Sequence, residues 1–144
     1  MAAVLTLLWL GPDAYARARA RWERGDWRDV QNWARLHTSR SAVFVTPPKE
    51  AGFRVFSERT AVGEWKDGTQ QYFDDAFVRE WGERMELLAG DAYPSLSDDA
   101  LLSIARRYTA SYIVLPARPV RRGLLQVYRN RNYAVYRALK VPTP

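Results

Sequence analysis

Residues 26–68 contain the pattern that most constrains the fold, an amphipathic helix followed directly by an apolar strand. The helix is predicted over residues 27–36, because apolar side chains recur at i, i+3, i+4 and i+7. These are Val30, Trp33, Ala34 and His37. Residues 42–46 (AVFVT) show no alternation, which is typical of a strand buried on both faces, and two prolines follow. This order is half of an α/β unit, in which ligands bind where strands end.

Helices and strands continue to alternate along the rest of the chain. A short extended segment at residues 53–56 leads to a second core strand at residues 60–65. Further strands are predicted at residues 112–115, 124–129 and 133–138, the last two forming a hairpin across Asn130, Arg131 and Asn132. Helices are predicted at residues 74–88 and after Ser97, which caps its helix, whereas residues 89–97 resemble a linker. The order predicts an α/β fold, a small three-layer sandwich with a mostly parallel core sheet extended by a C-terminal antiparallel hairpin.

The predicted α/β domain covers residues 26–144. Two further segments precede it, residues 1–12 and residues 13–25. Residues 1–12 are apolar, too short to span a bilayer alone, and end at Gly-Pro. We interpret them as the outer end of a transmembrane helix; the alternative is a buried element of the domain. A separate basic helix is predicted at residues 13–25, where Gly25 ends it. Its stripe of Arg17, Arg21 and Arg24 suits anionic headgroups, or is a solvated helix face.

Composition narrows the chemistry available to the chain. With no Cys and a single His, a zinc site is not expected, and no glycine-rich phosphate-binding motif or GxSxG sequence occurs. We therefore predict no catalytic residue, no metal and no cofactor. The net charge of +6 (22 basic minus 16 acidic side chains) fits an anionic partner or a solvated surface. A nucleic-acid partner is not indicated, because no RNP-like string is present.

One set of residues is expected to converge where the parallel strands end. The set consists of Arg54, Arg59, Trp65, Lys66, Asp67 and Arg118. Four cations around a Trp ring would suit a carboxylate, a phosphate or a stacked sugar, which predicts an anionic glycan or a lipid phosphate as ligand. The alternative is a structural network in which Glu58 and Asp67 neutralise the cations.

A family resemblance lies in the same residues. The run DWRDVQNWARLHTSRSAVFVTPPKEAGFRVFSERTAVGEWKDG, with the later FVREWGERM, ASYIVLPAR and VYRNRNYAVYRAL, resembles a C-terminal domain of unknown function. This domain is found on bacterial multi-span membrane proteins similar in layout to C-type glycosyltransferases, which use polyprenyl-phosphate sugars. The resemblance covers roughly residues 26–139. The WKDG sequence at residues 65–68 lacks the second Trp and the Tyr of the WWDYG signature of oligosaccharyltransferases, so no acceptor-binding role is carried over.

The resemblance implies a non-catalytic tail domain that assists substrate binding or packs on the membrane part of the same protein or on the membrane surface. It also implies an extracytoplasmic location, whereas basic residues beside a membrane helix favour the cytoplasmic side. The alternative function is a free-standing enzyme that acts on glycans or phosphoesters at the strand ends.

Overall fold

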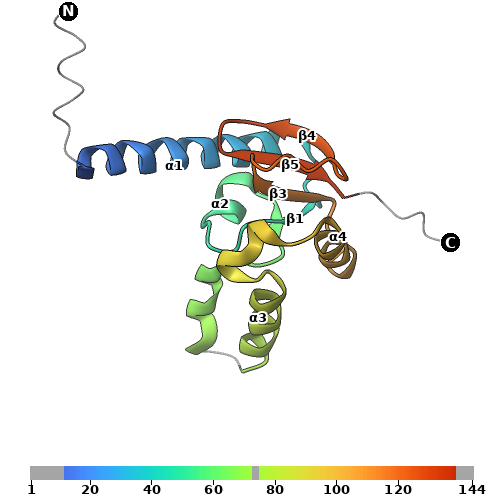
Figure 1. The fold of residues 1–144 in the computed structure, drawn as a ribbon. Helices are drawn as coiled ribbons and strands as arrows, with labels where there is room; N and C mark the ends of the chain where they lie inside the picture. Colours follow the sequence, from blue (N-terminus) through green and yellow to red (C-terminus); the bar gives the residue numbers. More distant parts are fainter. Residues whose placement is uncertain (1–11, 73–74, 139–144) are drawn as a thin grey trace, which may run out of the picture.

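The computed structural model describes residues 12–72 and 75–138. The α-helices are α1 (Pro12–His37), α2 (Phe53–Ser57), α3 (Asp75–Leu87) and α4 (Asp98–Arg107). Two 3-10 helices, η2 (Trp65–Tyr72) and η3 (Gly90–Ser95), flank α3. The strands are β1 (Val43–Val45), β2 (Thr60–Ala61), β3 (Tyr112–Pro116), β4 (Leu125–Arg129) and β5 (Tyr133–Arg137). The mixed α/β character predicted from the sequence is confirmed (Figure 1).

The strands form a single sheet in the order β2-β1-β3-β5-β4. β1 pairs in parallel with β2 and β3, whereas β5 is antiparallel to both β3 and β4. The three predicted core strands are therefore neighbours, and the C-terminal hairpin extends their sheet as expected. The pairings among the three core strands are parallel, as predicted, but the sheet as a whole is mixed and mostly antiparallel, because β2 has only two residues and the longest pairings involve β5.

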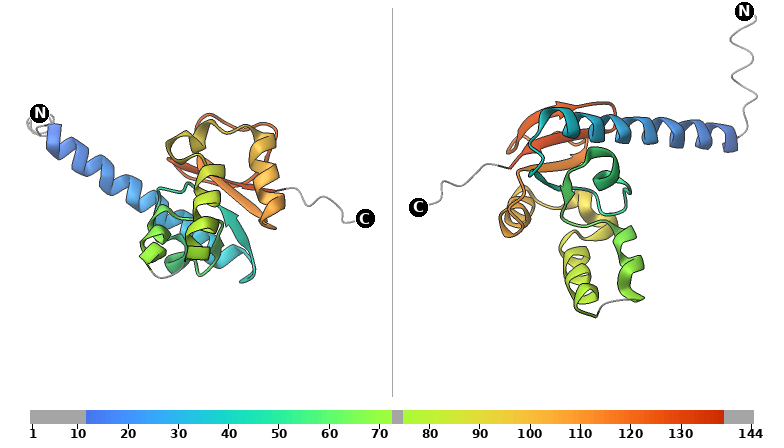
Figure 2. Two further views of the ribbon diagram at one scale, coloured as in Figure 1. Left: turned by 90° about the horizontal axis from the view of Figure 1, so that it is seen from below. Right: turned by 180° about the vertical axis from the view of Figure 1, so that it is seen from behind.

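Apolar side chains pack on both faces of the sheet. Successive strand residues point to opposite faces, so Phe44 joins the core beneath α1 and α2 while Val45 joins the core beneath α4. α1 and α4 lie on different sides of the sheet (Figures 1 and 2). The predicted three-layer sandwich is not confirmed, because α3 and η2 extend away from the sheet as a pair (Figure 2).

The helix before β1 is longer than expected. The predicted break at Gly25 does not occur, and α1 runs without interruption from Pro12 to His37. Glycine weakens a helix by about 1 kcal/mol without preventing its geometry. Asp26, the next residue, lies inside the helix and bonds to the hairpin turn, where its carboxylate accepts from Asn132 Nδ2 at 2.7 Å.

The segment after β1 also departs from the prediction. Residues 53–56 form the helix α2 instead of an extended piece, and the strand predicted at residues 60–65 ends at Ala61. Residues 65–72 turn into η2. Both differences arise from contacts made by Glu64 and Asp67, described below.

The segment predicted to be a linker is part of the core. η3 places Tyr93 at 1% exposure, where its hydroxyl donates to the Val114 carbonyl at 2.7 Å. Burial raises the pKa of Tyr93 far above its ordinary value. The next helix is as predicted: Ser97 accepts a hydrogen bond from the Ala100 N–H at 3.1 Å and caps α4.

The interpretation of the N-terminal apolar segment falls on residues 1–11, which lie outside the described residues. Within the described ranges, no helix is long and apolar enough to cross a membrane.

Candidate ligand site at the ends of the parallel strands

The loops that follow β1 and β2 lie against each other. The Trp65 N–H donates to the Pro48 carbonyl at 2.6 Å, and the Val62 N–H donates to the Phe44 carbonyl at 2.9 Å. These bonds continue the parallel pairing beyond the short β2. They bring the chain around Gly52 next to the chain around Glu64, as the strand-end prediction required.

Glu64 organises this junction, although sequence reasoning missed it. Glu64 is 5% exposed. Its carboxylate accepts hydrogen bonds from the N–H groups of Gly52 at 3.1 Å and Arg54 at 3.3 Å. A carboxylate at this position satisfies the free N–H groups at the start of α2. The sequence did not indicate this role of Glu64, because residues 53–56 were predicted to be extended and an extended segment has no helix start to cap.

Arg54 and Asp67 are joined directly. Arg54 Nη1 lies 2.6 Å from Asp67 Oδ2, and Arg54 Nη2 donates to the Ala61 carbonyl at 2.8 Å. The same Asp67 oxygen accepts the Glu64 N–H at 3.1 Å. The Arg54 side chain is 36% exposed, so the pair lies at the surface and leaves part of the guanidinium accessible.

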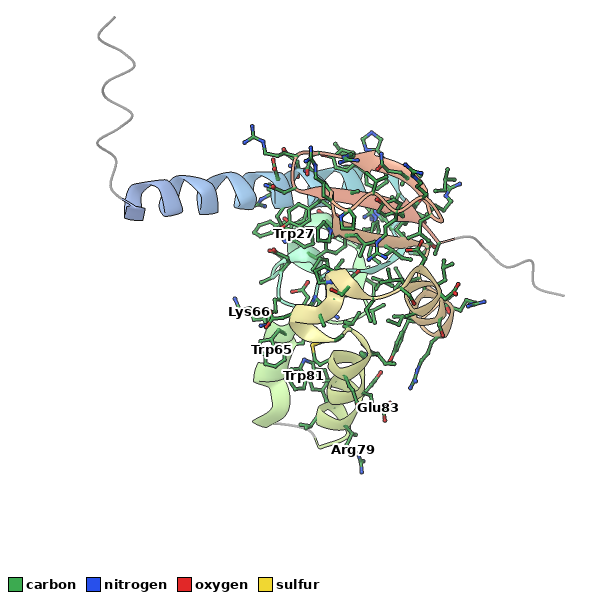
Figure 3. The ribbon with its side chains drawn as sticks, in the orientation of Figure 1. Trp27, Trp65, Lys66, Arg79, Trp81 and Glu83 are labelled. Carbon is green, nitrogen blue, oxygen red and sulfur yellow. The ribbon has the colours of Figure 1, made fainter. Side chains whose placement is uncertain are left out.

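Trp65 and Lys66 lie on the outside of this junction. Trp65 is 55% exposed, and its ring meets the Trp81 ring of α3 edge-to-face with a centroid distance of 5.6 Å (Figure 3). The Trp81 Nε1–H donates to the Glu64 carbonyl at 3.2 Å. Gly68 is required here, because a Cβ at this position would lie 2.6 Å from the Trp81 ring.

A small pocket of about 70 Å³ opens beside these residues. It is lined by Arg54, Gly63, Asp67, Phe77, Glu80, Trp81 and Arg84. Arg84 forms an ion pair with Glu80 and donates to the Val62 carbonyl at 3.0 Å, while its buried Nε has no hydrogen-bond partner among the described residues. Two cations face two carboxylates, so the pocket carries no excess of positive charge. It suits water or a small polar group better than a polyanion.

Arg59 does not join this group. It precedes β2, at the other end of the strand, and is 6% exposed. Its Nη2 donates to the carbonyls of Arg35 at 2.7 Å and Thr38 at 2.8 Å, and its Nε donates to Thr38 Oγ1 at 3.1 Å. Arg59 therefore caps the C-terminal end of α1, which links the first helix to the start of β2.

The two remaining predicted residues occupy different positions. Arg118 is exposed in the loop after β3, at the same edge of the sheet as the ends of β1 and β2. Glu58 is exposed and does not neutralise Arg59 through its carboxylate; its carbonyl accepts Arg59 Nη1 at 3.1 Å. The structure thus brings together Arg54, Trp65, Lys66 and Asp67, and it separates Arg59 from them.

No group of three or more His, Asp or Glu side chains in the described ranges could hold a metal ion. Residues 25–88 match the family model of a domain of unknown function, DUF6798. The matched segment contains every residue of the strand-end group except Arg118. Neither the curated proteins nor the solved structures include a significant match to this chain.

Proposed function

We propose that this chain is a non-catalytic α/β domain that α1 holds at a membrane surface. In this proposal it forms the tail of a bacterial multi-span membrane protein similar in layout to C-type glycosyltransferases. The observation that carries the proposal is the continuity of α1, which connects the domain core to the apolar residues at the N-terminus.

One part of α1 belongs to the domain core. Val30 and Ala34 are fully buried and Trp27 is 6% exposed, and all three pack against the sheet. The Trp27 Nε1–H also donates to the Ala51 carbonyl at 3.0 Å, which ties the helix to the loop before α2. This part of the helix cannot reorient without disrupting the core.

The other part of α1 runs out of the domain toward residues 1–11 (Figures 1 and 2). A helix of 26 residues is about 39 Å long at 1.5 Å per residue. The projecting part has the sequence PDAYARARARWER, with four Arg, one Asp and one Glu. A rigid basic helix between an apolar segment and a folded domain would keep the domain at a set distance and orientation from anionic headgroups.

Exposed apolar side chains next to the buried part of α1 also support binding at a membrane surface. On α2, Val55 is 72% exposed and Phe56 is 41% exposed, and the Arg28 guanidinium of α1 lies 3.3 Å from the Phe56 ring centroid. Aromatic rings combined with Arg suit the boundary between headgroups and acyl chains.

The rival function, an enzyme acting on glycans or phosphoesters at the strand ends, has weaker support. Arg54 forms an ion pair with Asp67, and Arg59 donates hydrogen bonds to the end of α1. These contacts favour the structural network over an open anion site at that edge.

Vesicle co-flotation of the full chain tests the proposal. We expect the protein to float with vesicles that contain phosphatidylglycerol and to lose most of this binding when Arg17, Arg21 and Arg24 are all changed to Gln. The interaction is electrostatic, at about 1 kcal/mol for each basic residue near the surface, so added salt should weaken it.

The matched control changes three exposed arginines elsewhere, Arg106, Arg122 and Arg129, to Gln. This variant has the same net charge as the helix variant and should still float. Equal loss of binding in both variants would show a general charge effect and would contradict a role for α1. Absence of binding by the wild-type chain would reject the proposal.

A further inference from the structure

A second surface pocket, a groove, lies at the opposite edge of the sheet, where β1 and β3 begin. It has a volume of about 630 Å³, which is much larger than the pocket beside Arg54. Three segments that are far apart in the sequence line it: the turn after α1, the start of β3 and the end of β5. The lining residues are Ser39, Ser41, Ala42, Ser111, Tyr112, Arg137 and Ala138.

The described lining of this groove is positively charged. Among the described residues that line it, Arg137 is the single charged one and none is a carboxylate. Arg137 is exposed, and its guanidinium lies 6.0 Å from the centroid of the Tyr112 ring. Within the described part of the chain, no ion pair joins Arg137 to an acidic side chain. No carboxylate of the described residues therefore competes with a ligand for the five N–H donors of its guanidinium.

Serine hydroxyls add further donors on the other walls. Ser39 and Ser41 share one hydrogen bond of 2.9 Å between their Oγ atoms, and the acceptor of that pair keeps its own proton for another partner. The backbone of Ser111 is fixed by the bonds from its N–H to the Val43 carbonyl at 2.9 Å and from the Ala138 N–H to its carbonyl at 3.0 Å. The Ser111 side chain is thus held at the groove by the sheet itself.

The end of α1 would normally oppose an anion at this position, because the C-terminus of a helix carries partial negative charge. Here a buried guanidinium offsets part of that charge. Arg59 binds the carbonyls of Arg35 and Thr38, and the Thr38 hydroxyl donates to the Ala34 carbonyl at 2.6 Å. The buried guanidinium of Arg59 supplies positive charge where the helix ends and occupies the carbonyls of Arg35 and Thr38.

We propose that this groove binds a phosphate or sulfate ester, with the oxyanion at Arg137 and the serine hydroxyls. A guanidinium combined with several hydroxyl donors matches the many acceptor atoms of such a group. The volume leaves room for an organic part beside Tyr112. The proposal is independent of the membrane-surface function, because its residues lie outside α1 and α2.

Amide NMR titration of the full chain with glucose 1-phosphate tests the site, with glucose as the uncharged comparison. Glucose 1-phosphate should shift the amides of Ser39, Ser41 and Ser111, and glucose should not. Vesicles containing phosphatidic acid form a second arm. Shifts with the sugar phosphate identify a soluble ester, and shifts with the vesicles alone identify a lipid headgroup.

The variant Arg137→Gln should weaken binding about 10- to 100-fold, the effect of one charge-assisted contact. Ser111→Ala should weaken it less. Arg129→Gln is the matched control, because Arg129 is an exposed arginine at the other end of the same hairpin. Equal effects of Arg137→Gln and Arg129→Gln would overturn the proposal, as would shifts with glucose as large as those with the phosphate. Absence of shifts in both arms would also overturn it.

Discussion

Arg59 donates hydrogen bonds to five oxygen atoms from a position that is only 6% exposed. Its Arg35 and Thr38 carbonyl partners belong to the end of α1 and the turn that follows, and would lose a donor if the guanidinium were removed. We expect Arg59→Ala to lower the free energy of unfolding by about 2–4 kcal/mol, because several buried and partly buried acceptors would lose their donor at once. Urea denaturation followed by circular dichroism measures the change.

The exposed Arg40 provides the reference for this measurement, and Arg40→Ala should change stability by less than about 0.5 kcal/mol. Arg59→Lys keeps the charge but loses the forked geometry, so it should fall between the two. If Arg59→Ala were as stable as Arg40→Ala, the capping role described here would be wrong.

At the scale of elements, the continuity of α1 is the feature on which the proposed function depends. Gly25 lies in the helix interior, is exposed, and would meet no atom within 4 Å if it carried a Cβ. Gly25→Ala should therefore raise the free energy of unfolding by about 0.5–1 kcal/mol, because alanine loses less backbone entropy in a helix. Denaturant unfolding measures this gain.

Gly82→Ala in α3 should give a similar gain, since that site is equally open. By contrast, Gly68→Ala should destabilise, because its Cβ would lie 2.6 Å from the rigid Trp81 ring. A loss of stability in Gly25→Ala, alongside a gain in Gly82→Ala, would indicate two helices with a break between them and would contradict a continuous α1.

At the scale of the whole molecule, the hairpin turn near the C-terminus holds the helix near the N-terminus. Asn132 Nδ2 donates to the Asp26 carboxylate at 2.7 Å, and Asn130 Nδ2 donates to the Asp26 carbonyl at 2.8 Å. A double-mutant cycle of Asp26→Ala and Asn132→Ala should give a coupling energy of about 0.5–1.5 kcal/mol, because the two groups share one partly buried bond.

The matched cycle uses Asp29→Ala with Asn132→Ala, since Asp29 is an exposed carboxylate one helical turn away. Those two changes should be additive within about 0.3–0.5 kcal/mol. Equal coupling in both cycles would show that the hairpin senses only the charge of α1 and makes no specific bond to Asp26.

The sequence by itself determined the elements whose signals are local. The apolar periodicity before β1, the unalternating core of β1 and β3, the Ser97 cap of α4 and the Asn-containing hairpin turn each depend on residues within a few positions of one another. Such signals survive without knowledge of the fold. The same reasoning placed Arg54, Trp65, Lys66 and Asp67 at one edge of the sheet, because the ends of parallel strands meet there.

Only the tertiary structure decided the rest, because the controlling contacts join residues far apart in the chain. α2 is a helix because the Glu64 carboxylate, ten residues beyond Arg54, receives its first N–H groups. Arg59 faces α1 because carbonyls left free by the end of that helix lie beside it. Gly25 remains helical because Trp27 and Val30 anchor the helix on the sheet beyond it, and local propensity is too weak to oppose that packing.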